Sequence, residues 1–269
     1  MTVIPPFDGV IRQHQQDEHI AWAMLPCACP QNHAANLLPL DDGSLMCVWF
    51  GGSQEGKADI SIWGSRLAPG SDRWSEAVKL SDDPDRSEQN PVLFQAPDNV
   101  LWLLWTAQFA GNQDTAIVRY RLSHDGGRSW GAIDTLLDQP GTFIRQPISV
   151  MSDGNWLLPV FYCRTEPGEK WVGNNDVSAV KISSDCGKSW RDVAVPESLG
   201  CVHMSITPLP DGRLAAFFRS RWADHIWFSQ SSDQERAGLR RYRRRFRTTT
   251  RPFRRPPWTM ANWRWCSII

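Results

Sequence analysis

Two cysteines near the start of the chain, Cys27 and Cys29, have a residue type and spacing that could bind a metal ion. They stand in the pattern C-x-C, and thiolates are good ligands for zinc. A structural metal site needs a second Cys or His pair, and none follows nearby. The pattern therefore favours two buried thiols, and we expect no metal and no cofactor.

The seven cysteines are an odd number, and the first residues, MTVIPPFDGVIRQHQ, lack a basic stretch followed by an apolar one. We therefore expect a reducing compartment and no disulfide framework. No run approaches the length of about eighteen apolar residues that a membrane span requires. These features predict a cytoplasmic protein without a membrane partner.

An eight-residue pattern that occurs twice sets the phase of the surrounding elements. Residues 123–130 read SHDGGRSW and residues 183–190 read SSDCGKSW, so both fit S-x-D-x-G-x-x-W. The Asp can accept hydrogen bonds from the N–H groups of a turn, the Gly provides a positive φ, and the Trp is a large apolar anchor. Each copy predicts a compact hairpin tip, and two copies indicate an internal repeat.

Strand–turn–strand units recur around these tips. Their turn residues lie about 55 residues apart, at Gly43, Asn99, Gly154 and Gly212, and Asn and Gly tolerate the positive φ of a hairpin turn. No stretch has the apolar period of about 3.6 residues that indicates a helix. Four strands per unit at this spacing are typical of a β-propeller blade, and a β-sandwich is the alternative.

Charge is divided unevenly along the chain. The 29 Lys and Arg balance the 29 Asp and Glu, but residues 236–269 contain eleven Arg and no acidic residue, so residues 1–235 carry a net charge of −11. An Arg-rich arm with interleaved Trp and Phe could bind nucleic acid. The abrupt change of composition at Gln234 and the lack of Lys favour a shifted reading frame instead.

The genetic code supports this frameshift. The codons of residues 258–267, read one frame over, permit the string D-x-G-x-L-A-x-V-F, which is similar to PDGRLAAFF at residues 210–218. Loss of one nucleotide after Asp233 would also restore S-S-D-x-G-x-x-W from Ser231 onward. We therefore expect residues 234–269 to be a frameshift product that is disordered or poorly packed, and we do not expect a nucleic-acid partner.

The tips, the repeat length and residues 32–66 (NHAANLLPLDDGSLMCVWFGGSQEGKADISIWGSR) together resemble the sialidase (neuraminidase) superfamily, in its bacterial branch with BNR/Asp-box repeats. The resemblance implies an all-β fold, a six-bladed β-propeller of which this chain holds about four blades. It divides the chain into a lead-in segment (1–30), a partial propeller (31–233) and the Arg-rich tail (234–269). It also implies that the Asp-boxes are structural and distant from the active site.

Sialidases hold a substrate carboxylate with three Arg side chains, which suit it through bidentate bonds. The first family Arg is replaced here by His33, a departure that weakens such a clamp. Arg219, in the segment FFRSR, matches the second. Arg145 has a similar position at the start of a strand and is a further substrate-binding candidate. The third family Arg lies in later blades.

The family's catalytic groups are a Tyr nucleophile activated by a Glu, and an Asp general acid/base. The resemblance assigns the acid/base to the loop after the first hairpin, where Asp59 and Glu55 are the candidates. The Glu position holds His203, which could act as an acid/base or as a hydrogen-bond donor to a sugar. Tyr120 and Tyr162 do not stand at the nucleophile's position, which falls in later blades.

The resemblance therefore implies a sialidase-like exo-glycoside hydrolase acting on terminal acidic sugars, with a glycan or small acidic sugar as its partner. Because four blades cannot close a six-bladed ring, we expect this chain to expose a sheet edge, to be poorly soluble and to be impaired in activity. The alternative is a non-catalytic carbohydrate-binding propeller. A nucleic-acid-binding protein that acts through the tail is the third hypothesis.

Overall fold

The structure, a computed structural model, describes residues 6–27, 29–231 and 240–242. These residues form antiparallel β-sheets and one short 3-10 helix, η1 (Gln113–Thr115), and contain no α-helix. No helix in this part of the chain is long and apolar enough to span a membrane. The predicted all-β class is confirmed.

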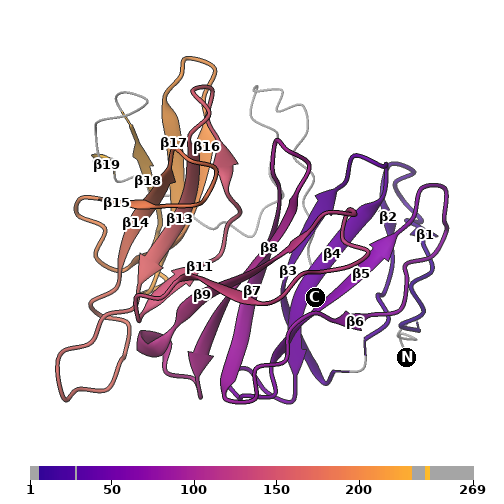
Figure 1. Cartoon of the computed structure of the whole chain (residues 1–269), viewed down its shortest axis with the longest axis horizontal. Helices are drawn as coiled ribbons and strands as arrows, with labels where there is room; N and C mark the ends of the chain where they lie inside the picture. Colours follow the sequence, from indigo (N-terminus) through magenta and orange to yellow (C-terminus); the bar gives the residue numbers. More distant parts are fainter. Residues whose placement is uncertain (1–5, 28, 232–239, 243–269) are drawn as a thin grey trace.

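Four sheets follow one another along the chain as the blades of a β-propeller (Figure 1). Blades 1 and 2 consist of β3 (Gln31–Pro39), β4 (Leu45–Gly52), β5 (Ser61–Leu67) and β6 (Val78–Lys79), then β7 (Arg86–Gln95), β8 (Leu101–Phe109), β9 (Ile117–Ser123) and β10 (Asp134–Leu137). In both blades consecutive strands are hydrogen-bonded neighbours. The first strand is the inner one, and β3 lies against β7.

Blades 3 and 4 repeat this order, with one change. The strands are β11 (Thr142–Ile144), β12 (Ser149–Val150), β13 (Trp156–Tyr162), β14 (Val177–Ser183) and β15 (Arg191–Ala194), then β16 (Cys201–Pro208), β17 (Leu214–Ser220), β18 (Ile226–Gln230) and β19 (Arg240–Tyr242). In blade 3 the inner strand is broken, because β11 and β12 both pair with β13. The prediction of about four propeller blades is confirmed.

The strand β19 comes from the Arg-rich tail and pairs with β18. The rest of the expected frameshift product, residues 234–239 and 243–269, lies outside the described residues, and so does its hidden hairpin.

Each predicted hairpin turn is present. Gly43, Asn99, Gly154 and Gly212 have φ values of 80°, 66°, 85° and 83°, so every turn uses the left-handed backbone region that Gly and Asn tolerate. In each turn an Asp precedes this residue. In the first, for example, the Asp42 carboxylate accepts a hydrogen bond from the Ser44 N–H at 3.1 Å. Local turn chemistry therefore fixes where each inner strand ends.

The inner strands have a backbone irregularity at the same position of each repeat, nine residues before the hairpin turn. Ala34, Asn90 and His203 stand there with φ values of 55°, 53° and 54°, and each lies within a β-bulge. In blade 3 the residue at this phase is Arg145, in the gap between β11 and β12. A bulge re-aims side chains and is frequent near binding sites.

Apolar side chains between neighbouring blades form the core. Trp105 is fully buried in the cluster shared by blades 1 and 2. Between blades 2 and 3, Trp102 and Trp156 meet edge to face with ring centroids 5.6 Å apart. Phe218 and Trp227 belong to the cluster of blades 3 and 4. Each buried aromatic side chain contributes about 2–3 kcal/mol of hydrophobic stabilisation, so the blades are held face to face.

The lead-in segment contains the short strands β1 (Arg12–Gln13) and β2 (Ala21–Trp22), which pair with each other. It is joined to blade 1 in the loop between β5 and β6, where the Trp74 N–H donates to the Gly9 carbonyl at 3.0 Å.

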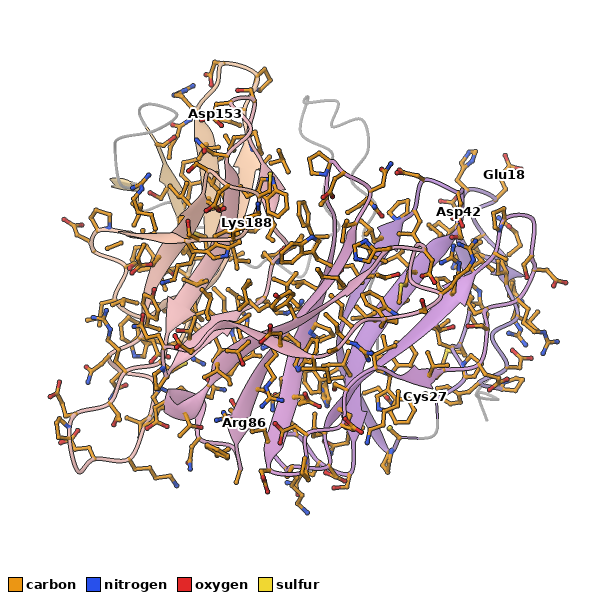
Figure 2. The ribbon with its side chains drawn as sticks, viewed as in Figure 1. Glu18, Cys27, Asp42, Arg86, Asp153 and Lys188 are labelled. Carbon is orange, nitrogen blue, oxygen red and sulfur yellow. The ribbon has the colours of Figure 1, made fainter. Side chains whose placement is uncertain are left out.

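The propeller has two chemically different faces. The first, here called the Asp-box face, carries the hairpin turns and the tips at residues 123–130 and 183–190. The second, here called the loop face, carries the starts of the inner strands and four loops: 53–60, 110–116, 163–176 and 221–225. In Figure 2, Asp42 and Asp153 lie toward the upper side, on the Asp-box face, and Arg86 lies toward the lower side, on the loop face.

Candidate active site

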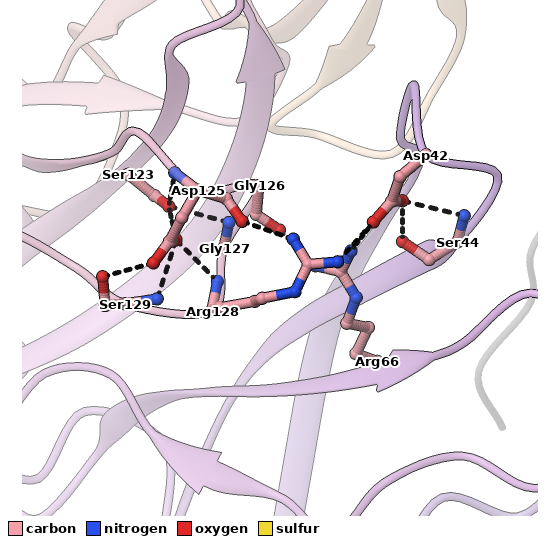
Figure 3. A network of polar contacts seen from close by, with 9 residues as sticks. All are labelled: Asp42, Ser44, Arg66, Ser123, Asp125, Gly126, Gly127, Arg128 and Ser129. Carbon is pink, nitrogen blue, oxygen red and sulfur yellow. Dashed lines mark hydrogen bonds and ion pairs between the residues drawn. The ribbon is translucent and has the colours of Figure 1, made fainter.

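The polar groups of the Asp-box face are occupied in holding turns (Figure 3). The Asp125 carboxylate accepts hydrogen bonds from the N–H groups of Arg128 at 3.0 Å and Ser129 at 2.8 Å. The hydroxyl of Ser129, followed by these backbone donors, lowers the pKa of Asp125. In the second box, the same kind of bonding to Ser189 lowers the pKa of Asp185 to about 2. Both boxes therefore stabilise their tips.

The first box also connects two blades. Arg128 donates to Asp42, at the turn of blade 1, over 2.8 Å, and Arg66 donates to the same carboxylate and to the Gly126 carbonyl (Figure 3). In the part of the Asp-box face that Figure 3 shows, these polar groups are bonded to one another and are not left over to bind a ligand.

All six predicted site residues belong to the loop-face half of the propeller. His33, Glu55 and Asp59 are in blade 1, while Arg145 is in blade 3 and the remaining two, His203 and Arg219, are in blade 4. In the last three, the charges of Arg145 and Arg219 act on the His203 ring. Among the described residues, no hydrogen bond or ion pair joins them to the blade 1 group.

The blade 1 residues are all exposed. His33 stacks on Phe50 with ring centroids 5.3 Å apart, and the Glu55 N–H donates to a side-chain oxygen of Gln31 at 3.0 Å. Asp59 accepts a hydrogen bond from the Ser53 N–H at 3.0 Å, and bonding to Ser53 lowers the pKa of Asp59. Without a substrate, Asp59 is therefore a carboxylate, ready to accept a proton rather than to donate one.

His203 is the centre of the blade 3 and 4 group. Its ring packs against Phe161 with centroids 5.2 Å apart. Burial lowers the pKa of His203 to about 3, and the positive charges of Arg219, Arg145 and Arg221 contribute in that order. His203 is therefore a neutral imidazole at physiological pH, able both to donate and to accept a hydrogen bond.

The two predicted arginines whose charges act on His203, Arg145 and Arg219, differ in burial and in the side of the strand on which they lie. Arg145 is half-buried, and burial lowers its pKa, yet its guanidinium has no hydrogen-bond or ion-pair partner in the described part of the chain. Arg219 is exposed. It alternates along β17 with Phe218, which packs toward blade 3, so its side chain is on the other side of that strand. A carboxylate would supply the counter-charge that Arg145 lacks.

Arg221, Asp176 and Gln113 were not predicted from the sequence. Arg221 is the second arginine of the segment FFRSR, in which only Arg219 was singled out. Its side chain is bonded to Asp176 and Gln113, and its charge acts on His203. The repeated arginine was the only signal for this residue. No local pattern marks Asp176 or Gln113.

Two tyrosines, Tyr120 and Tyr162, have side chains that the structure describes. The Tyr162 hydroxyl donates to Asp192 at 2.7 Å, and burial, followed by this bond, raises the pKa of Tyr162. Tyr120 stacks on Trp102 with centroids 5.2 Å apart.

The two N-terminal thiols are half-buried. Cys27 donates to Asn32 at 2.7 Å, and burial raises the pKa of Cys29 to about 11, so Cys29 is protonated at neutral pH. Among the described residues, no three His, Cys, Asp or Glu side chains are grouped closely enough to hold a metal ion.

Four successive antiparallel blades, two of them with an Asp-box tip, define a partial β-propeller. The chain belongs to the BNR repeat-like domain family, which matches residues 43–237. No curated protein matches the chain in sequence.

Solved structures share this fold at low sequence identity. The Hadza microbial sialidase Hz136 is 13% identical, with a TM-score of 0.61 over 78% of this chain and 46% of its own. Trypanosoma rangeli sialidase in complex with sialic acid is 13% identical, with a TM-score of 0.58 over 84% of this chain and 39% of its own. A Dyadobacter fermentans DSM 18053 protein of unknown function is 17% identical, with a TM-score of 0.61 over 84% and 69%. The chain thus spans less than half the length of these two sialidases.

Proposed function

We propose that this chain is part of a sialidase-like exo-glycoside hydrolase that acts on terminal acidic sugars. One observation carries the proposal: the half-buried Arg145, whose charge acts on the neutral His203, has no hydrogen-bond or ion-pair partner among the described residues. A sugar carboxylate would supply that charge and bond to the planar guanidinium in a bidentate manner. His203 would then bond a sugar hydroxyl or the carboxylate itself.

The catalytic part of the proposal concerns blade 1. Asp59 would act as general acid/base, with Glu55 beside it on the same loop. Since bonding to Ser53 lowers the pKa of Asp59, the acid role requires substrate binding to exclude water and raise that pKa. His203, with a pKa of about 3, is a weak base and is better suited to positioning the sugar than to proton transfer.

A non-catalytic carbohydrate-binding propeller is the second candidate. The bonding of Tyr162 to Asp192 and the stacking of Tyr120 on Trp102 favour it, because both tyrosines with described side chains make contacts within their own blades. Both candidates share the carboxylate site and differ only in turnover.

Binding is tested with sialic acid and its methyl ester, which differ in the charge of one group. We expect sialic acid to bind at least tenfold more tightly than the ester by calorimetry, and the variant Arg145→Met to lose this preference. Arg66→Met, which removes an arginine from the Asp-box face, is the matched control and should keep it. Equal binding of the acid and the ester would contradict the proposed site.

Turnover is tested with fluorogenic sialosides and uronides. We expect low activity from the unaltered chain and higher activity once the reading frame is restored after Asp233. Release of fluorophore that is lost in Asp59→Asn supports the hydrolase, whereas sialic acid binding without turnover in the restored protein supports the binding propeller.

A further inference from the structure

Arg221, directly after β17, is the most heavily bonded arginine of the loop face. Its Nε donates to the Asp176 carboxylate at 2.7 Å, and its Nη2 donates to the side-chain oxygen of Gln113 at 2.9 Å. Gln113 belongs to blade 2, Asp176 to blade 3 and Arg221 to blade 4. One side chain therefore joins the loops of three consecutive blades.

The surroundings of this pair are suited to a buried charge. The Asp176 side chain is fully buried and that of Arg221 is 15% exposed. The Trp171 indole N–H donates to the same carboxylate at 3.0 Å, as does the Arg164 backbone N–H at 3.2 Å. The guanidinium lies 5.0 Å from the centroid of the Trp171 ring, within the range of a cation–π contact. A buried ion pair is tolerated only when its remaining bonding groups are satisfied in this way.

Backbone bonds extend the connection to the inner strand that carries His203. The Gly200 N–H donates to the Asp176 carbonyl at 2.7 Å, and the Arg221 N–H donates to the Gly200 carbonyl at 2.9 Å. Gly200 immediately precedes β16, in which His203 lies. Movement of the Asp176 loop would therefore displace the start of the strand that positions His203.

Arg221 and Arg145 differ in their bonding, which indicates different roles for the two arginines. The Nε and Nη2 of Arg221 face Asp176 and Gln113, so one of the guanidinium edges that can bind a carboxylate in a bidentate manner is occupied. Arg145 has no such partner among the described residues. Arg145 is therefore the better candidate for the ligand contact, and the bonds of Arg221 suit it to hold its neighbours in place.

We propose that Arg221 is a positioning residue: with Asp176 and Gln113 it ties the loop-face segments of blades 2, 3 and 4 together and so holds the start of β16, and with it His203, in place for a carboxylate ligand. This inference rests on the proposed function for the ligand's identity. The tie itself can be tested without any ligand.

The test uses the double variant Arg221→Met/Asp176→Leu, which replaces both charges with apolar groups and leaves neither unpaired. We expect it to melt cooperatively, to bind sialic acid at least tenfold more weakly than the unaltered chain, and to exchange amide hydrogens faster at residues 110–116 and 163–176. Arg66→Met, on the opposite face, should change neither the affinity nor the exchange. Unchanged affinity and unchanged exchange in the double variant would overturn the proposal.

Two further measurements decide the proposal if the double variant does not fold or if sialic acid does not bind. If the double variant fails to fold, Gln113→Leu removes the blade 2 bond without leaving a buried charge, and it should accelerate exchange at residues 110–116 and weaken binding; wild-type exchange and affinity there would overturn the tie. If the unaltered chain binds no sialic acid, the proposed function fails, and exchange in the double variant alone decides whether Arg221 ties the loops.

Discussion

Arginine and aspartate join neighbouring blades on both faces of this propeller, but in opposite environments. On the Asp-box face, Arg66 and Arg128 share Asp42, which is 36% exposed. On the loop face, Arg221 bonds Asp176, which is fully buried. Water screens the first set and is excluded from the second. The comparison teaches that the Asp-box face is held mainly by many local turn bonds, whereas the loop face depends on a few buried charges.

The largest expected effect is the loss of one buried partner. Arg221→Leu leaves Asp176 charged and uncompensated, so we expect the free energy of unfolding to fall by about 3–5 kcal/mol. Urea denaturation measures it. The double variant Arg221→Met/Asp176→Leu should recover most of the loss. A single variant as stable as the unaltered chain would show that the two faces do not differ in this respect.

The pH dependence of stability should come next in size. The pKa of His203 is about 3 in the folded chain and about 6.5 when unfolded. Its stabilising effect is therefore complete above the unfolded pKa and is lost as pH falls, because only the unfolded state takes up the proton. Between pH 6.5 and pH 5 we expect a loss of about 2 kcal/mol.

Urea denaturation at pH 7, 6 and 5 measures this dependence. His203→Gln, which cannot take up that proton, should show a loss smaller by about the same amount. Parallel curves for the two proteins would place the acid sensitivity elsewhere.

The turn bonds of the Asp-box face predict a smaller and more local effect. Asp125→Ala removes the acceptor of the Arg128 and Ser129 N–H groups, and we expect Tm to fall by about 5 °C. Sialic acid binding should not change, since the tip lies on the other face. A loss of affinity without a change in Tm would contradict the division between the faces.

The smallest expected effect is that of the exposed blade connection. Arg128→Met removes one of two arginines from Asp42, and surface ion pairs contribute little, so Tm should change by less than about 4 °C. Scanning calorimetry in low and high salt checks this. A larger fall would mean that the exposed pair is as important as the buried one.

The sequence was sufficient for the blades because their signals are local. Each hairpin is fixed within a few residues, by a turn residue such as Gly43 or Gly154 or by the Asp-box at residues 123–130. The regular spacing of these hairpins along the chain indicated that Arg145 and His203 lie on inner strands. Because the strand–turn–strand unit repeats along the chain, a position in one blade can be found by counting residues from the turn of that blade.

The buried tie could not be predicted in the same way. Arg221 and Asp176 are 45 residues apart, and Gln113 is 108 residues from Arg221, so they meet only because blades 2, 3 and 4 pack side by side. The low pKa of His203 has the same origin, since burial between elements and charges from two blades produce it. For Asp59 and Glu55, the sequence identified the loop, and their catalytic roles stay predictions.

We propose that an acidic sugar binds at Arg145 and His203, on the loop face. Nitrogen NMR of the histidine rings at pH 7, assigned with His203→Gln, tests it most directly. On addition of sialic acid we expect the His203 ring signals to shift while those of His14, in the lead-in segment, do not, and we expect Arg145→Met to abolish the shift. Saturating sialic acid that leaves the His203 signals unmoved would contradict the account.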